Sequence, residues 1–503
     1  MRKPRLIYEN DARHHLLYRF APPLSVHRLR QPVDELLGTS VDTLFYGFVS
    51  QQTQPFEAKA GLYWLWHRSE QAQVMWWRGG QNLKQALEAG NDPLKIAVDR
   101  AHEHGIQVLT WLHWEAREPD SDDFNTYSDH VDPEVRRRRL ETIEDACDRY
   151  ELDGIGLNYY VPSTTFSAEV GRPTDAPNNP PALTGFVREV RALLDRIGEK
   201  RGQRLGLAVQ VHSNEDANTE SGLEVRKWLS EKLVDLVVPT SPHPNSPQDT
   251  ALLDTNPSLD WMVEAAHEAG AWVYAPIVNA VYDDRQYEAT IEMYRAAATN
   301  HLANGADGLY LSSLRWPHTA NEYEILREMG YPAVYSRKTK HYMLGHRAAD
   351  SGAYAPVRKL PIMLEEGVPS EVTVFVGDAL DAARQDGELD RVTLGVRIVQ
   401  VGDEDTISFK LNGHDLPVEQ ATIEWIYGGS VSYMAQRGEL PRRIHTHLWY
   451  TFHVPPNALQ EGENVVQVTL DRRDDTLITD RVLHAMEIKV FYDEPHSPSG
   501  GQM

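Results

Sequence analysis

The sequence lacks the features that would place it among disulfide-rich or membrane proteins. It contains one cysteine, Cys147, so no disulfide can form within the chain, and we expect a buried, inert thiol. No apolar run reaches the roughly 18 residues that a membrane-spanning helix needs. The first residues lack the apolar core of a signal peptide. We therefore expect no membrane partner, and either a cytoplasmic location or the earlier removal of a signal.

Basic residues are also in short supply. The chain has 50 Lys and Arg against 74 Asp and Glu, which gives a formal net charge of -24. Proteins that bind DNA or RNA regardless of sequence need a basic face for the phosphates. We therefore expect no nucleic-acid partner. The acidic surface itself is most often a sign of solubility and identifies no partner.

What the sequence does contain is a regular alternation of apolar strand-like runs and helical segments. This order predicts an α/β fold with a parallel sheet, and short continuous apolar runs are typical of strands covered on both faces. Eight such units predict a closed (β/α)8 barrel. An open, doubly wound sheet is the alternative, which the lack of a Gly-rich loop after the first strand weakens. The predicted strands are 5–10, 41–48, 106–113, 154–160, 204–212, 234–240, 271–279 and 307–314.

The pattern changes after about residue 345. Short alternating runs such as "EVTVFVGD", "RVTLGVRIVQ" and "AMEIKVFY" are separated by turn signals, with little helix between them. This predicts an antiparallel β-sandwich. We therefore expect a barrel over residues 1–345, an accessory sandwich over 350–493 and a disordered tail over 494–503.

Two segments share one pattern, "YELDGIGLNYY" (150–160) and "NGADGLYLSSLRW" (304–316). In each, Asp-Gly marks the turn from a helix into a strand, and polar and aromatic residues follow at the carboxyl end of the strand. Barrel enzymes build their sites at that end. Aromatic rings can stack on sugar rings, while amides, imidazoles and guanidinium groups hydrogen-bond to hydroxyls. The candidate binding residues are Asn10, His14, His113, Trp114, Asn158, Tyr159, Tyr160, His212, Asn279, Arg315 and Trp316.

Four acidic residues at strand ends are candidates for catalysis: Glu115, Glu215, Asp11 and Asp283. Cleavage of a glycosidic bond usually needs two carboxyl groups, one protonated and one ionised. Glu115 is the first choice because its aromatic surroundings would suit a general acid, and Glu215 is its expected partner. Each has a structural alternative: a turn cap at Asp11, an ion pair between Glu115 and Arg117, a solvated loop at Glu215 and a helix N-cap at Asp283.

We expect neither a metal nor a cofactor. His14 and His15 lie near Asp11, but spacing fixes no third ligand for a metal. Trp76 and Trp77, after the second strand, fit equally well an aromatic wall of a cleft and the packing of that segment onto the barrel.

In combination, "RLIYENDARHH", "VDTLFYGF", "NDPLKIAVDRAHEHGIQVLTWLHWE" and "YELDGIGLNYY" resemble the glycoside-hydrolase-like (β/α)8 proteins of bacterial polysaccharide degradation, over residues 5–316. The run "YTFHVPPNALQEGENVVQVTL" resembles the galactose-binding-like jelly rolls attached to many sugar-active enzymes. The resemblance implies hydrolysis of a plant or algal polysaccharide, or of its oligosaccharides, by carboxylates at the barrel mouth.

One departure from that family pattern matters. The fourth strand ends in Asn158 and Tyr159, and the seventh ends in Asn279, where such hydrolases often carry acids. The usual acid and nucleophile therefore cannot be carried over to these positions. Two other hypotheses stay open: a carbohydrate-binding barrel without catalysis, and a polysaccharide lyase that uses Tyr or His.

Overall fold

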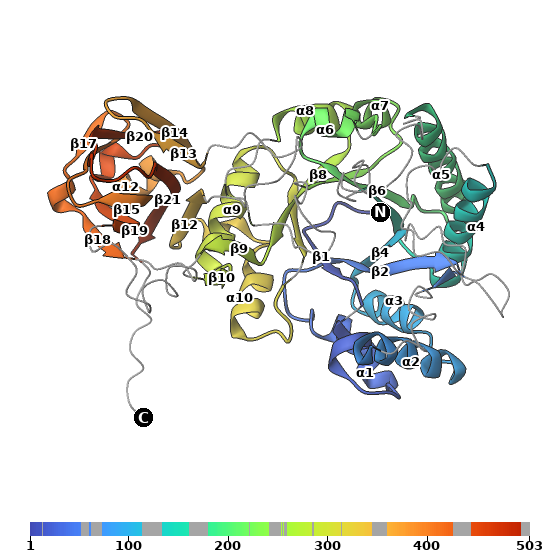
Figure 1. Cartoon of the computed structure of the whole chain (residues 1–503). Coiled ribbons are helices and arrows are strands. Elements are labelled where there is room, and N and C mark those ends of the chain that lie inside the picture. Colours follow the sequence, from blue (N-terminus) through green and yellow to red (C-terminus); the bar gives the residue numbers. More distant parts are fainter. Residues whose placement is uncertain are drawn as a thin grey trace.

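The protein consists of an α/β barrel and a β-sandwich that lie side by side (Figure 1). The sandwich, at the red end of the colour scale, lies next to helix α9 of the barrel. The computed structural model describes residues 1–12, 14–51, 60–61, 73–112, 133–159, 180–220, 222–240, 253, 255, 259–283, 286–312, 314–344, 360–425 and 444–493.

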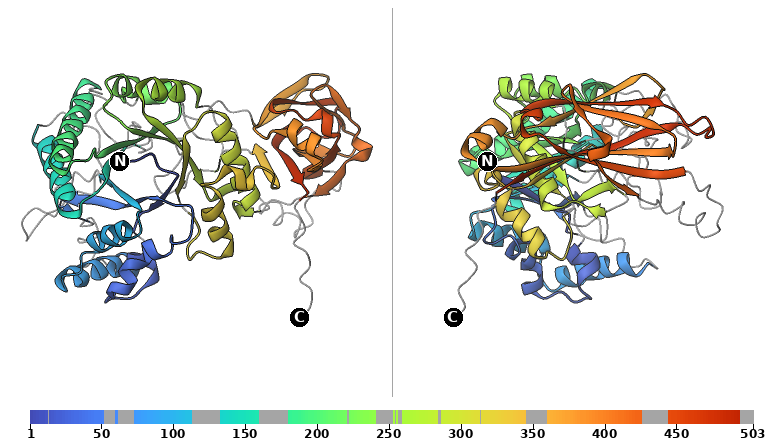
Figure 2. Two further views of the ribbon diagram at one scale, coloured as in Figure 1. Left: turned by 180° about the vertical axis from the view of Figure 1, so that it is seen from behind. Right: turned by 90° about the vertical axis from the view of Figure 1, so that its left-hand side faces the viewer.

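Eight parallel strands form the closed barrel, which confirms the predicted fold class. The ring closes because β1 pairs in parallel with both β11 and β2. In Figure 2, seen from behind, the amino terminus lies within the ring of strands. A short strand, β3 (Ala60–Gly61), pairs antiparallel with β2. The barrel strands are β1 (Leu6–Asn10), β2 (Thr43–Gln51), β4 (Gln107–Leu112), β5 (Gly154–Asn158), β6 (Gly206–His212), β7 (Leu236–Thr240), β8 (Trp272–Val278) and β11 (Gly308–Ser312).

Helices surround the ring and bury an apolar layer against the outer faces of the strands. Among the described helices, none is long and apolar enough to cross a membrane. Cys147 lies in the buried face of α4, and burial raises the pKa of its thiol to about 12, as expected for an inert thiol. The helices are η1 (His14–Arg19, a π-helix), α1 (Val26–Asp34), α2 (Val74–Glu88), α3 (Pro93–Glu103), α4 (Pro133–Tyr150), α5 (Pro180–Arg201), α6 (Glu215–Glu220), α7 (Val225–Ser230), α8 (Asp260–Ala269), α9 (Ile291–Ala303), α10 (Ala320–Glu328) and α11 (Pro332–Tyr335).

An aspartate clasp fixes every second strand to the strand before it, at the amino end of the barrel. In each clasp the aspartate N–H donates to a backbone carbonyl of the preceding strand, and its carboxylate accepts the N–H of that same residue. The aspartates are Asp42, Asp153, Asp235 and Asp307, which clasp Leu6, Val108, Leu207 and Val273 at carboxylate–nitrogen distances of 3.4, 2.8, 2.8 and 2.9 Å. The repeated Asp-Gly of the two similar segments is therefore a fixed element of the barrel base.

Removing one clasp is expected to destabilise the protein measurably. Asp153→Ala leaves the part-buried N–H of Val108 without its carboxylate acceptor, and an unsatisfied buried donor costs about 1–3 kcal/mol. Asp153→Asn keeps an acceptor oxygen and should lose less. Urea unfolding measures the free energy. The control is Asp148→Ala, an exposed position on α4 where we expect a change within about 0.5 kcal/mol. Equal stability of Asp153→Ala and this control would contradict the clasp.

The carboxyl-terminal strands form two antiparallel sheets with an apolar core between them, as the alternation predicts. One sheet has the order β12-β21-β15-β19-β18, with β13 also paired to β21, and the other has the order β14-β20-β16-β17. The strands are β12 (Lys340–Leu344), β13 (Ile362–Leu364), β14 (Pro369–Val376), β15 (Leu389–Gly402), β16 (Thr406–Leu411), β17 (His414–Leu416), β18 (Thr422–Trp425), β19 (Ile444–Val454), β20 (Gly462–Arg472) and β21 (Arg481–Tyr492); helix α12 is Leu380–Asp386. Because β12 joins this sandwich, the sheet begins before residue 345.

Asn300, on the buried face of α9, joins the barrel to the sandwich. Its side-chain amide donates to the carbonyls of Thr255 and of Phe375, the latter at 2.8 Å, and its oxygen accepts the N–H of Gly377 at 2.7 Å. A Cβ at Gly377 would lie 2.9 Å from the Cβ of Ala303, so this close approach requires glycine.

Asn300→Ala is expected to weaken this junction. The substitution leaves the backbone groups of Phe375 and Gly377 without these partners, at a cost of about 1–3 kcal/mol for an unsatisfied group. Urea unfolding should show the loss, together with faster hydrogen exchange in β14. Asn304→Ala is the matched control, since the Asn304 side chain donates to the carbonyl of Asn300 in α9 and not to the sandwich contacts of Asn300. If Asn304→Ala lowered the free energy of unfolding as much as Asn300→Ala, the role of Asn300 at this junction would be contradicted.

Candidate functional site

The carboxyl end of the barrel carries an inner ring of polar side chains. Successive side chains of a strand point to opposite faces, so residues two apart share a face. Ile7, Trp111, Ala208 and Tyr310 lie in the apolar cluster that fills the barrel interior. Polar residues that share these inward faces lie two or four residues nearer the carboxyl ends of their strands. They make up the inner ring: Glu9, Asn158, Gln210, His212 and Ser312.

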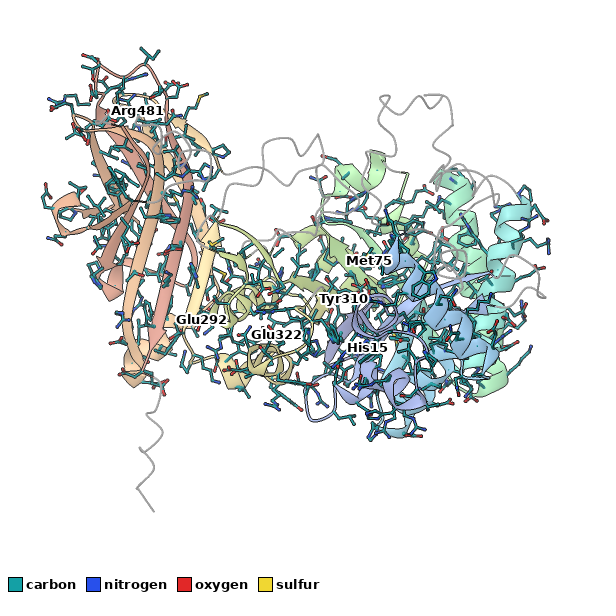
Figure 3. The ribbon with its side chains drawn as sticks, turned by 60° about the horizontal axis from the view of Figure 1, so that its bottom comes forward. His15, Met75, Glu292, Tyr310, Glu322 and Arg481 are labelled. Atoms are coloured by element: carbon teal, nitrogen blue, oxygen red, sulfur yellow. The ribbon has the colours of Figure 1, made fainter. Side chains whose placement is uncertain are left out.

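Below this ring lies an aromatic floor made of Phe45, Trp111 and Tyr310. Ring centres are 4.7 Å apart for Phe45 and Trp111 and 5.6 Å for Phe45 and Tyr310. The Trp111 indole N–H donates to the Tyr310 hydroxyl at 3.1 Å. Figure 3 shows Tyr310 among the barrel strands. Gly156 makes room for this floor, because a Cβ there would lie 2.2 Å from the Trp111 ring.

Glu9 stands over the aromatic floor and was missed in the sequence analysis. It is aligned with Phe45 in the pairing of β1 and β2, and its carboxylate lies near the Tyr310 hydroxyl. Burial, and next the charge of Glu9, raise the pKa of Tyr310 well above its usual range, so the Tyr310 hydroxyl keeps its proton. The alternation within "LIYEN" was the available signal, since Glu9 shares the face of the buried Ile7.

His212 is the buried imidazole of the inner ring. Burial lowers its pKa to about 4, so the ring is neutral near pH 7. Its backbone is fixed by Asn218, whose amide oxygen accepts the His212 N–H at 3.0 Å and whose nitrogen donates to the His212 carbonyl at 2.8 Å. The position of this predicted binding residue is therefore well defined.

Of the four predicted catalytic side chains, the structure describes those of Asp11 and Glu215. Glu115 lies outside the described residues, and of Asp283 only the backbone, in β9 (Ala280–Asp283), is described; β9 pairs with β10 (Gln286–Glu288). Asp11 is part-buried directly after β1. Glu215 opens α6 in an exposed ion pair with Arg226, and that hydrogen bond lowers the pKa of Glu215. A lowered pKa suits an ionised carboxylate and not a general acid.

Several predicted binding residues lie away from the inner ring. Asn10 points to the other face of β1, where its side-chain oxygen accepts the Ala12 N–H at 2.9 Å. Tyr159 is buried against Trp228, with ring centres 5.5 Å apart. The exposed Arg315 pairs with Glu288 at 3.2 Å, and Asn279 accepts the Ala289 N–H through its backbone carbonyl. The side chain of His14, and residues His113, Trp114 and Tyr160, lie outside the described part.

Trp316 belongs to a charged cluster outside the ring. Its indole N–H donates to Glu35 at 3.2 Å, and the Arg19 guanidinium lies 4.1 Å from the ring centre. Burial opposes the ionisation of Glu35, but the nearby His15 ring and hydrogen bonds from Arg19 and Trp316 outweigh it and lower the pKa to about 2. The ring centres of His15, labelled in Figure 3, and Trp316 are 5.4 Å apart. Since Arg19 covers one face of Trp316, a sugar cannot stack on that face.

The described residues contain no group of three or more His, Cys, Asp and Glu side chains that could hold a metal. Trp76 packs against the barrel core, whereas Trp77 is 41% exposed.

A hollow of about 730 Å³ lies at the amino end of the barrel, lined in part by Arg2, His102 and Asp153. Because barrel enzymes act at the carboxyl end, we assign it no catalytic role.

No known protein family and no curated protein matches this sequence. Among solved structures, the chain is similar to a glycoside hydrolase family 18 N-acetylglucosaminidase from Paenibacillus barengoltzii, at 13% identity and a TM-score of 0.37, over 64% of this chain and 98% of that one. It is also similar to a multi-modular chitinase from Paenibacillus sp. str. FPU-7 (10% identity, TM-score 0.43, 92% and 52% of the two chains). A third is catalytic domain 2 of an Ostrinia furnacalis Group II chitinase (12%, 0.39, 65% and 96%). Likeness at this level does not identify the chemistry of this chain.

Proposed function

We propose that this protein is a glycoside hydrolase that acts at the carboxyl end of its barrel. The observation that carries the proposal is the inner ring, where Glu9, Asn158, Gln210 and His212 face the barrel interior above the aromatic floor. Amides, a neutral imidazole and a carboxylate offer the donors and acceptors that sugar hydroxyls need. A carboxylate at this place also meets the first requirement of glycosidic cleavage.

For the protonated member of the carboxyl pair we propose Glu115, which follows β4 in the chain. Its neighbours in the sequence, His113 and Trp114, would favour a neutral carboxyl group. The exposed ion pair of Glu215 argues against that residue as the acid, while Asp11 and Asp283 stay alternatives for the partner.

The substrate class that we propose is a plant or algal polysaccharide or its oligosaccharides, as the family resemblance implies. The sandwich is proposed to be an accessory module that stabilises the barrel through α9. A carbohydrate-binding barrel without catalysis would use the same inner ring, and a lyase would need a Tyr or His base in place of the carboxyl pair.

Product analysis tests the proposal. The full chain is incubated with plant and algal polysaccharides and with chitooligosaccharides, and reducing ends and ultraviolet absorbance are followed together. Hydrolysis predicts new reducing ends without absorbance from an unsaturated product. Absorbance that rises with the reducing ends would identify a lyase, and tight binding without any product would identify a binding protein. Either result overturns the proposal.

A further inference from the structure

Glu9 is the only acidic side chain that the described barrel strands place inside the ring at its carboxyl end. It is part-exposed, whereas the three rings of the aromatic floor beneath it are fully buried. A solute that enters the barrel from this end would therefore meet the carboxylate before it met the floor. A carboxylate inside a barrel raises the free energy of the folded protein unless neighbouring groups stabilise its charge. The placement of Glu9 therefore needs an explanation.

The hydroxyl of Tyr310, which Trp111 holds in place, lies near Glu9. The Trp111 N–H can only donate, so the Tyr310 oxygen is its acceptor at 3.1 Å. The Tyr310 hydroxyl proton is then free to point to the nearby Glu9 carboxylate. Because the indole N–H cannot accept this proton, Tyr310 can offer it to the carboxylate as a donor. A hydrogen bond to the charged form favours ionisation.

We infer that Glu9 is the ionised catalytic carboxylate of this barrel and that Tyr310 is its positioning residue, an inference that rests on the proposed function. Glu9 acts as the general base. It takes a proton from water while the water oxygen bonds to the anomeric carbon. The bond from that carbon to the glycosidic oxygen breaks, and the leaving oxygen takes both bonding electrons and a proton from the general acid of the pair. One water is consumed, and the proton on Glu9 returns to the acid through solvent.

Two variants test this inference on the full chain with the substrate that the wild type cleaves. Glu9→Gln keeps the size and removes the base, so we expect kcat to fall by about 10²–10⁴-fold, the usual worth of general acid–base catalysis. Tyr310→Phe removes only the hydroxyl, which is also the acceptor of the Trp111 N–H. We expect kcat/KM to fall on the order of 10-fold, and the acidic limb of its pH profile to move to higher pH, because ionised Glu9 has lost a donor.

Tyr274→Phe is the matched control for Tyr310→Phe. Tyr274 is also fully buried inside the barrel, but its hydroxyl donates to the carbonyl of Pro4 at the amino end. We expect this control to leave the acidic limb in place. Circular dichroism and thermal unfolding identify any variant that has lost its fold.

The possible outcomes separate this inference from the proposed function. If the wild type cleaves a glycosidic bond and a folded Glu9→Gln keeps near-normal turnover, the role of Glu9 is overturned and hydrolysis stands. If Tyr274→Phe shifts the acidic limb as much as Tyr310→Phe, the positioning role is overturned. A wild type that cleaves nothing overturns both the function and the inference. Loss of turnover in Glu9→Gln together with a limb shift confined to Tyr310→Phe supports the inference.

Discussion

Replacing Glu115 with glutamine is expected to lower turnover by about 10²–10⁴-fold, the range typical for the loss of a general acid. Glutamine keeps the size and hydrogen-bonding capacity of the side chain but cannot donate a titrating proton. Glu115 follows β4, the strand that carries Trp111 of the aromatic floor. Initial rates on the natural substrate, with circular dichroism to verify folding, measure the effect.

Glu231→Gln is the matched control, because it makes the same change at an exposed carboxylate paired with Arg188. Exposed pairs contribute little, so both stability and turnover should stay near those of the wild type. A folded Glu115→Gln with near-normal turnover would contradict the assignment. Strong loss in Glu215→Gln instead would move the acid to the loop after β6.

The largest expected loss of stability is at Asp405 in the sandwich. Its carboxylate accepts hydrogen bonds from Arg481 at 2.7 and 2.9 Å, and both side chains are fully buried. Figure 3 shows Arg481 at the end of the sandwich away from the barrel. Asp405→Ala leaves the Arg481 charge buried without its carboxylate, which typically costs about 3–5 kcal/mol. Urea unfolding, followed by hydrogen exchange in β15 and β21, measures the loss.

A neighbouring pair provides the control. Glu404 and Arg472 form an exposed ion pair at 3.0 Å, so Glu404→Ala should cost about 0–1 kcal/mol. The double change of Asp405→Ala with Arg481→Met removes the stranded charge and should recover part of the stability. Equal losses in Asp405→Ala and Glu404→Ala would show that the buried pair contributes no more to stability than the exposed pair.

The sequence was sufficient for the architecture because each barrel strand has its own local signal. Asp153-Gly154 and Asp307-Gly308 mark two strand starts, and the aspartate clasps explain why that pattern recurs. The β12 strand was missed because "KHYML" is short and its partner, β21, lies at the other end of the sandwich sequence. Pairing over so long a separation leaves no signal within the strand itself.

The site was less predictable than the fold, for a physical reason. The predicted site residues lie at or after the last residue of a strand, whereas Glu9 lies one residue before the end of β1, and its direction depends on which face of β1 is inside. Trp316 looked like a sugar platform, but Arg19, from a distant segment, covers one face of its ring. Such neighbours are set by tertiary packing and cannot be read from local spacing.

The central claim is that this barrel cleaves glycosidic bonds with water. The most direct test is cleavage in water enriched in ¹⁸O, with mass spectrometry of the products at times too short for the reducing ends of added product sugars to exchange oxygen. The account predicts one heavy oxygen at each newly formed reducing end. Products that form without the label, or no products at all from any glycan that the protein binds, would contradict it.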